Sequence, residues 1–94
     1  IAELAEHYGL PVALHNCGSL VHNMANVHFG ASVRNFNMSE SRLYAHPYIA
    51  EMGGLDGFDL VDGMLGVPAG PGLGIELVPE VLRAELAAGE PFWD

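Results

Sequence analysis

The sequence predicts an α/β fold organised around a parallel sheet, and three observations support this. Two short apolar runs, residues 11–14 and 33–38, have the length of strands. Segments with helical periodicity precede the first run and separate it from the second, at residues 1–8 and 20–29. The loops that join these segments are short. Such alternation of helix and strand is typical of right-handed βαβ crossovers and a parallel sheet.

The first helix and the first strand have clear boundaries. Apolar residues recur at helical spacing at Ile1, Leu4, Ala5 and Tyr8. Gly9 follows, and glycine is the residue that most readily adopts the left-handed conformation that ends a helix. The next run, Pro-Val-Ala-Leu at residues 11–14, is apolar without alternation, which predicts a strand that is covered on both faces.

A second helix and a second strand follow. Ser19 is a residue type that caps helices, and an apolar stripe is expected at Leu20, Val21, Met24, Ala25 and Phe29. We interpret this stripe as core and not as a cofactor site. Gly-Ala-Ser at residues 30–32 closes the helix. The strand over residues 33–38 is the weaker of the two predictions because it contains Asn35 and Asn37.

The second half of the chain predicts less regular structure. Residues 41–57 contain one proline and three glycines and are expected to form a long loop with one helical turn at most. Asp62-Gly63 favours a type I′ turn, so the flanking residues 58–61 and 64–67 predict a β-hairpin. Residues 68–74 hold two prolines and three glycines and should be irregular. A helix is predicted over residues 79–87, with Pro79 at its first position.

Composition excludes several classes of partner. The net charge is −9, with three arginines and no lysine, so nucleic acids and anionic membrane surfaces are not expected to bind. The one cysteine, Cys17, cannot form an internal disulfide, and no apolar run reaches the roughly 20 residues that span a bilayer. We therefore expect a cytoplasmic protein. A domain of this size buries only about 60–65% of its unfolded surface and is marginal by itself, so we also expect a missing N-terminal part or a homo-oligomer. The first helix begins at Ile1 without an initiator methionine, which favours a missing N-terminal part.

The residues that carry chemistry are predicted at the ends of the two strands. His15 follows the first strand and Glu40 follows the second, and the carboxyl ends of parallel strands are the usual place for active sites. A histidine with a pKa of about 6.5 can act as a base near neutral pH. Both residues also have ordinary structural interpretations: His15 as a hydrogen-bonded polar residue, and Glu40 as a solvated loop carboxylate or a helix-capping partner.

Other polar residues are interpreted as structural. His22 and His28 are six positions apart on the predicted helix, so they point to different faces and lack the spacing of a metal site. His15 and Cys17 together make a poor zinc site because further spaced ligands are missing, and Cys17 is interpreted as a small packing residue. The glycines at 70, 72 and 74 should shape a chain reversal and not a phosphate loop.

Three segments carry a resemblance to a known family. They are the run that begins at His15, Asn-Phe-Asn-Met-Ser-Glu at residues 35–40, and Gly-Pro-Gly-Leu-Gly-Ile-Glu-Leu at residues 70–77. Together they resemble the C-terminal quarter of the mandelate racemase and muconate lactonizing enzyme branch of the enolase superfamily. The resemblance implies the last two strands of a modified (β/α)₈ TIM barrel, with residues 1–94 as its C-terminal segment. It also implies that residues 58–94 are a tail that packs on a capping domain.

The resemblance further implies an activity and roles for particular residues. Family members bind Mg²⁺ through carboxylates on the third to fifth strands, which would precede Ile1, so no metal ligand is expected in this chain. His15 would be the acid/base residue that removes a proton next to a carboxylate. Glu40 would hydrogen-bond a substrate carboxylate oxygen or donate a proton to it, and donation requires a raised pKa. Apart from the resemblance, Asn16, Ser19 and Asn37 lie near the same strand ends. We expect them to contact a polyhydroxylated substrate, because sugar acids need several neutral hydrogen-bonding groups.

We therefore expect a Mg²⁺-dependent sugar-acid dehydratase, a lyase whose partner is a small anionic substrate. Two alternatives stay open from the sequence. One is a racemase, epimerase or cycloisomerase, because these enzymes use the same enediolate on the same scaffold. The other is a catalytically empty fragment, because the metal ligands and most of the barrel strands are not in this chain.

Overall fold

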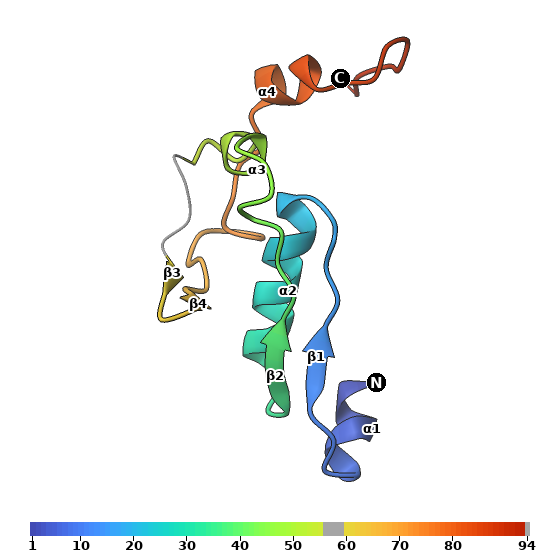
Figure 1. The fold of residues 1–94 in the computed structure, drawn as a ribbon, viewed down its shortest axis with the longest axis vertical. Helices are drawn as coiled ribbons and strands as arrows, with labels where there is room; N and C mark the ends of the chain where they lie inside the picture. Colours follow the sequence, from blue (N-terminus) through green and yellow to red (C-terminus); the bar gives the residue numbers. More distant parts are fainter. Residues whose placement is uncertain (56–59, 94) are drawn as a thin grey trace.

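A computed structural model describes residues 1–55 and 60–93 and confirms a mixed α/β arrangement (Figure 1). The elements in chain order are α1 (Ala2–His7), β1 (Val12–Leu14), α2 (Leu20–Ser32), β2 (Phe36–Ser39), α3 (Tyr48–Glu51), β3 (Leu60–Val61), β4 (Met64–Leu65) and α4 (Pro79–Ala84). Residues 58 and 59 of the predicted hairpin lie outside the described residues.

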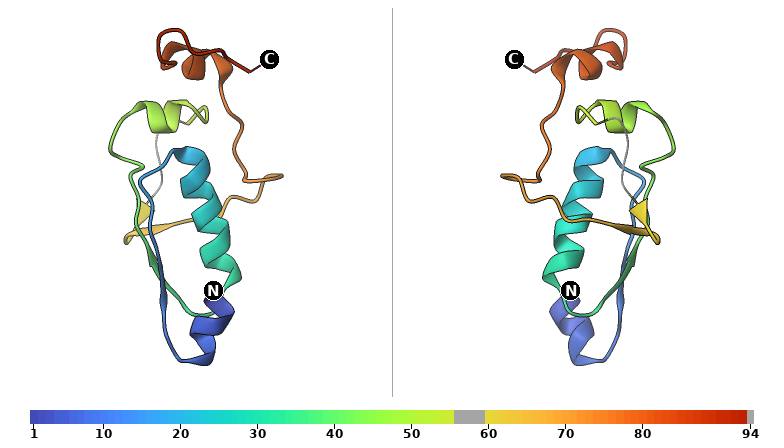
Figure 2. Two further views of the ribbon diagram at one scale, coloured as in Figure 1. Left: turned by 90° about the vertical axis from the view of Figure 1, so that its right-hand side faces the viewer. Right: turned by 90° about the vertical axis from the view of Figure 1, so that its left-hand side faces the viewer.

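The two predicted strands pair in parallel, as expected from the sequence. Ala13 of β1 is opposite Met38 of β2, and Leu14 is opposite Ser39. Helix α2 connects the strands and runs along one face of the pair (Figure 2). The helix lies close to β2: a Cβ atom added at Gly30 would lie 2.9 Å from the Phe36 ring. A glycine at this position therefore allows the helix to pack directly on the strand.

The expectation that the first strand is covered on both faces is wrong for this chain. Val12 and Leu14 are half-buried, whereas Ala13 between them is exposed. Among the described residues, α2 is the layer against this strand pair, and it lies on one face (Figure 2). The absence of alternation in this apolar run indicates a strand whose two faces are both meant to be covered. In this chain one face of β1 is left open.

The second strand begins three residues later than predicted. Residues 34 and 35 form a turn, and the Asn35 side-chain amide donates to the carbonyl oxygens of Ala2 and Leu10, both at 3.0 Å. These bonds fix the turn against the α1 region. Asn35 thus holds the turn after α2 in place, and β2 begins at the next residue, Phe36.

The end of α1 follows the sequence prediction. Gly9 has φ +66°, its N–H donates to the Glu6 carbonyl, and the Leu10 N–H donates to the Ala5 carbonyl, both at 2.9 Å. This is the Schellman pattern, which satisfies the last carbonyls of a helix. The left-handed glycine sends the chain directly into β1.

The predicted apolar stripe of α2 is correct at Leu20 and Met24 only. Both are buried, but Val21, Ala25 and Phe29 are exposed. The buried face includes Asn23 instead, whose side-chain amide donates to the Ser19 carbonyl at 2.9 Å. Ser19 is the N-cap residue, but its side chain makes no capping hydrogen bond. The buried face of α2 therefore differs from the predicted one, and it includes a polar residue whose amide is satisfied by the helix backbone.

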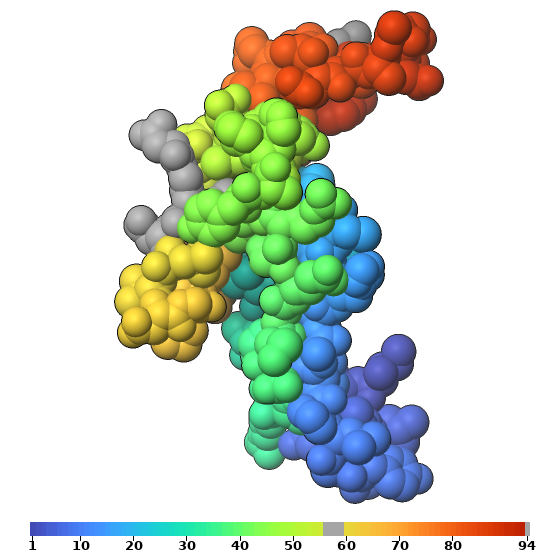
Figure 3. Space-filling model, in the orientation of Figure 1, coloured from blue at the N-terminus to red at the C-terminus, as the bar shows by residue number. Residues whose placement is uncertain are grey.

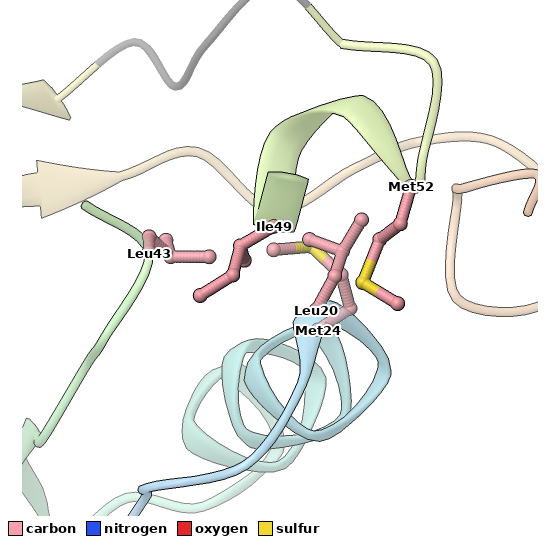
Figure 4. Close-up of a cluster of buried hydrophobic side chains, with 5 residues drawn as sticks. All are labelled: Leu20, Met24, Leu43, Ile49 and Met52. Atoms are coloured by element: carbon pink, nitrogen blue, oxygen red, sulfur yellow. The ribbon is translucent and has the colours of Figure 1, made fainter. Parts of the chain in front are cut away.

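The core lies between the start of α2 and the single turn α3, which confirms one helical turn in the long loop. Its buried members are Leu20, Met24, Leu43, Ile49 and Met52 (Figure 4). A Cβ atom added at Gly53 would clash with the Leu20 side chain. The core thus holds the loop after β2 against the helix that follows β1.

The hairpin prediction is confirmed within the described residues. Leu60 pairs with Leu65 and Val61 with Met64 in antiparallel register. Asp62 (φ 51°) and Gly63 (φ 75°) are both in the left-handed region, as a type I′ turn requires. Residues 68–74 are irregular, as predicted. His28 of α2 hydrogen-bonds the Leu73 carbonyl oxygen at 3.2 Å, which holds this segment against the helix.

Helix α4 starts at Pro79 as predicted but ends at Ala84, three residues early. The following residues turn back so that the Arg83 guanidinium carbon lies 4.2 Å above the Phe92 ring. Phe92 in turn stacks on Trp93 with 4.3 Å between ring centroids. This cation–π contact holds the C-terminal segment against the end of α4.

The molecule is elongated and exposes much apolar surface. Its Cα radius of gyration is 15.3 Å, whereas about 12 Å is usual for a compact domain of this length. Its accessible surface of 6786 Å² exceeds the roughly 5,200 Å² expected for its mass. Figure 3 shows α1 and α4 at opposite ends and the hairpin at one side. The large apolar side chains that are more than half exposed are Ile1, Leu4, Tyr8, Leu10, Met38, Tyr44, Val61, Met64 and Trp93.

Within the described residues, none of the helices has the length and apolar character needed to cross a bilayer. The packing of residues 58–94 on a capping domain stays a prediction.

Candidate functional site

The structure brings the two strand-end residues together. His15 directly follows β1 and Glu40 directly follows β2, and the Glu40 N–H donates to the Leu14 carbonyl oxygen at 2.8 Å. This bond extends the parallel ladder by one residue, so the side chains of His15 and Glu40 leave the sheet at the same edge. Nδ1 of His15 lies 2.6 Å from Oε2 of Glu40, which is a short, charge-assisted contact.

The surroundings of Glu40 favour its ionised form. The backbone N–H of Asn16 donates to Oε2 at 3.1 Å and is the largest influence that lowers the pKa of Glu40. Partial desolvation opposes this effect, while the His15 contact and the Arg42 charge add to it. The pKa of Glu40 is therefore lowered, opposite to the raised pKa that a proton-donating Glu40 would need.

The ionised carboxylate fixes the tautomer of His15. An oxygen without a proton, 2.6 Å from Nδ1, requires that Nδ1 carry a hydrogen. In the neutral ring Nε2 is then an acceptor, and a base can take a proton at this atom. The His15 side chain is 77% exposed and that of Glu40 52% exposed, so a small molecule can reach the pair in this chain.

The loop after β1 is braced from both sides. Asn16 is fully buried, and its Oδ1 accepts from the Gly18 N–H at 2.8 Å. Its Nδ2 lacks a hydrogen-bond partner within the described residues. Asn26 of α2 donates to the His15 carbonyl oxygen at 3.2 Å. The backbone of His15 is thus held by the helix that follows it, which positions the imidazole for Glu40.

The three predicted substrate-binding residues have different surroundings. Asn16 touches the pair through its backbone N–H. Ser19 is half-buried at the start of α2, where its carbonyl oxygen accepts from Asn23. Asn37 is exposed on β2. Between residues 1 and 55, the structure gives neither Ser19 nor Asn37 a hydrogen bond to the His15–Glu40 pair. Substrate contact by these three residues stays a prediction.

The interpretation of Cys17 as a packing residue is wrong for this structure. The thiol is exposed, and its Sγ lies 3.5 Å from Nε2 of His15. The sequence contained a signal for this contact, because residues two apart in an extended segment lie on the same side. Cys17 therefore belongs to the site, on the opposite side of the imidazole from Glu40.

The described residues do not form a metal centre by themselves. Across residues 1–55 and 60–93, no group of three or more His, Cys, Asp or Glu side chains is arranged to hold an ion. His15, Glu40 and Cys17 form a chain of contacts through the two opposite ring nitrogens, which does not converge on one point. These side chains are arranged to move a proton.

The lowered pKa of Glu40 predicts a dependence of stability on pH. A carboxylate whose pKa is lower in the folded state contributes stability that is fully present above its unfolded pKa. This contribution is lost as the pH falls through the folded-state pKa. Glu40→Gln should therefore reduce the stability difference between neutral and strongly acidic pH, measured by denaturant unfolding of the intact protein. Glu3→Gln on α1 is the control for one lost charge, and equal pH profiles for Glu40→Gln and the wild type would contradict the prediction.

Comparisons with known proteins agree with the resemblance seen in the sequence. The family described as "Enolase C-terminal domain-like" matches residues 1–81. A D-xylonate dehydratase from Haloferax volcanii is 33% identical over 95 aligned positions, which cover all of this chain. This chain spans 23% of the length of that relative.

Proposed function

This chain belongs to the enolase C-terminal domain-like family, and from that premise we propose that it is the C-terminal part of a sugar-acid dehydratase. The family match and the similarity to a D-xylonate dehydratase support this proposal. The observation that carries it is the His15–Glu40 pair at the carboxyl ends of two parallel strands. A base with a fixed tautomer at this place is what proton abstraction next to a carboxylate requires.

We assign β1 and β2 to the last two strands of a modified (β/α)₈ barrel. Their parallel pairing and the helix on one face support this assignment. In a barrel, each strand pairs on both sides and its inner face packs against the other strands. The open face of β1 and the exposed apolar side chains would then be covered by the rest of the protein or by further copies.

His15 would act first as a base and then as an acid. Nε2 takes the proton from the carbon next to the carboxylate, and the imidazolium that forms is stabilised by Glu40 at Nδ1. The electrons left on carbon expel the hydroxyl group from the neighbouring carbon. Nε2 returns its proton to this leaving oxygen, so that water departs and an enol remains. The enol rearranges to a 2-keto acid without further help from the protein.

Glu40 would orient His15 and accept a hydrogen bond from the substrate. Because its pKa is lowered and it is ionised, it would repel a substrate carboxylate at close range. The contacts described for its carboxylate both use Oε2. We therefore propose that Oε1 accepts from a hydroxyl of a polyhydroxylated acid. Asn16, Ser19 and Asn37 remain the candidates for further substrate hydroxyls.

Family membership implies Mg²⁺ as a cofactor. It would supply positive charge against the enediolate that forms. The described residues do not fit this ion, since they contain no suitable ligand cluster. Its ligands would therefore lie outside the described residues, and we assign no step to it here.

The proposal is tested by incubating the intact, Mg²⁺-loaded protein with a panel of sugar acids that includes D-xylonate. In D₂O, dehydration should yield a 2-keto acid that has lost one water, detected by mass spectrometry. A product that keeps all the oxygen atoms of the substrate, and carries deuterium in place of hydrogen at the carbon next to the carboxylate, would identify a racemase or epimerase instead. If no acid in the panel loses water or exchanges this hydrogen, the proposed function is wrong.

A further inference from the structure

The geometry points to a second role for this site: we propose that Cys17 is a nucleophilic thiol activated by His15, and that it is the site at which small carbon electrophiles modify the protein. The suitable electrophiles are small acids or amides with a leaving group on the carbon beside the carbonyl. The proposal does not depend on dehydration, because the thiol reaction uses no sugar acid and no metal.

Three groups form a continuous relay. Glu40 contacts Nδ1 of His15 at 2.6 Å, and Cys17 contacts Nε2 of the same ring at 3.5 Å. Since the carboxylate keeps the hydrogen on Nδ1, Nε2 is the acceptor and the thiol is the donor. Carboxylate, imidazole and nucleophile stand in the order that general-base activation of a thiol or hydroxyl requires.

The loop holds the thiol beside the imidazole. The Gly18 N–H bonds to the Asn16 side chain at 2.8 Å, which closes a tight turn around Cys17. Asn26 holds the backbone of His15 from α2. The relay is therefore fixed at residues 15, 16 and 18, while Cys17 itself is exposed. An electrophile can reach a thiol whose partner base is already in position.

The reaction with iodoacetamide illustrates the proposed step. The thiol proton passes to Nε2 as the sulfur attacks the carbon that carries iodine. An S–C bond forms and the C–I bond breaks, and iodide leaves with the bonding electron pair. The imidazolium then releases its proton to water. The adduct remains next to Nε2, the atom at which the proposed dehydration begins.

The experiment measures alkylation of Cys17 by iodoacetamide in the intact protein at neutral pH, followed by mass spectrometry of the peptide that contains it. His15→Gln should slow the reaction about tenfold, because the base is lost. Glu40→Gln should slow it less, because Nε2 remains but its tautomer is no longer fixed. His46→Gln, which changes an exposed histidine outside the relay, is the matched control and should react at the wild-type rate.

Two results would overturn the proposal. One is an equal alkylation rate in the wild type and His15→Gln, each confirmed as folded by circular dichroism. The other concerns the wild type alone and so applies even if a variant does not fold. The proposal requires Cys17 to be alkylated faster in the native protein than in guanidinium chloride, and a slower reaction in the native protein would exclude activation. Neither measurement involves turnover, so the protein can fail as a dehydratase while the thiol relay is confirmed, or the reverse.

Discussion

His15→Asn should lower kcat for sugar-acid dehydration by about 10²–10⁴-fold in the intact enzyme, the range for loss of one general acid–base group. The expected loss is large because one ring nitrogen of His15 both takes the proton and returns it to the leaving hydroxyl. Asparagine keeps a polar side chain of similar reach but cannot accept a proton near neutral pH. Steady-state assays with the best substrate from the sugar-acid panel measure the effect.

A second measurement separates a chemical role for His15 from a structural one. Mg²⁺ affinity, followed by calorimetric titration, should be nearly unchanged in His15→Asn because the ligands are assigned outside this chain. His7→Asn is the matched control: it makes the same replacement on α1, beyond the opposite end of β1, and should retain wild-type turnover. Turnover within a few-fold of wild type in His15→Asn would remove this residue from the mechanism.

The location of the site could be predicted from the sequence, but its electrostatics could not. Abrupt changes from apolar to polar residues after Leu14 and Ser39 identify strand ends, and the parallel register then brings His15 and Glu40 together. The protonation state of Glu40 depends on where the backbone N–H of Asn16 points. That direction depends on the folded path of the loop after β1, where the Asn16 side chain accepts from the Gly18 N–H, and the residue types alone do not specify it.

The fold shows the same division between local signals and long-range contacts. The Schellman end at Gly9 and the Asp62-Gly63 turn depend on local residue preferences, and both follow from the sequence. The turn that precedes β2, by contrast, contains Asn35, whose side chain bonds to the distant carbonyl oxygens of Ala2 and Leu10. The buried face of α2 likewise includes Asn23, whose side chain bonds to the Ser19 carbonyl oxygen. Hydrogen bonds from side chains to the backbone can favour a different structure from the one that the apolar pattern predicts. The periodicity of the sequence does not show which of the two determines the fold.

Leu20→Ala should be the most destabilising substitution of a single side chain in this segment, by about 2–5 kcal/mol in the free energy of unfolding. Leu20 is fully buried and lies at the centre of the core between α2 and α3 (Figure 4). Gly53 lies so close that a Cβ there would clash with Leu20. Because glycine has no side chain to move into the space, truncation should leave a cavity that closes poorly.

The control for this substitution is Leu20→Met, which keeps the side-chain volume and should cost less than about 1.5 kcal/mol. Both variants are compared by denaturant unfolding of the intact protein. The core also holds the loop after β2 against the helix after β1, so Leu20→Ala should loosen the approach of Glu40 to His15 and lower kcat more than Leu20→Met does. Equal stability of the two variants would show that the space at Leu20 collapses, and that the site does not depend on this core for its geometry.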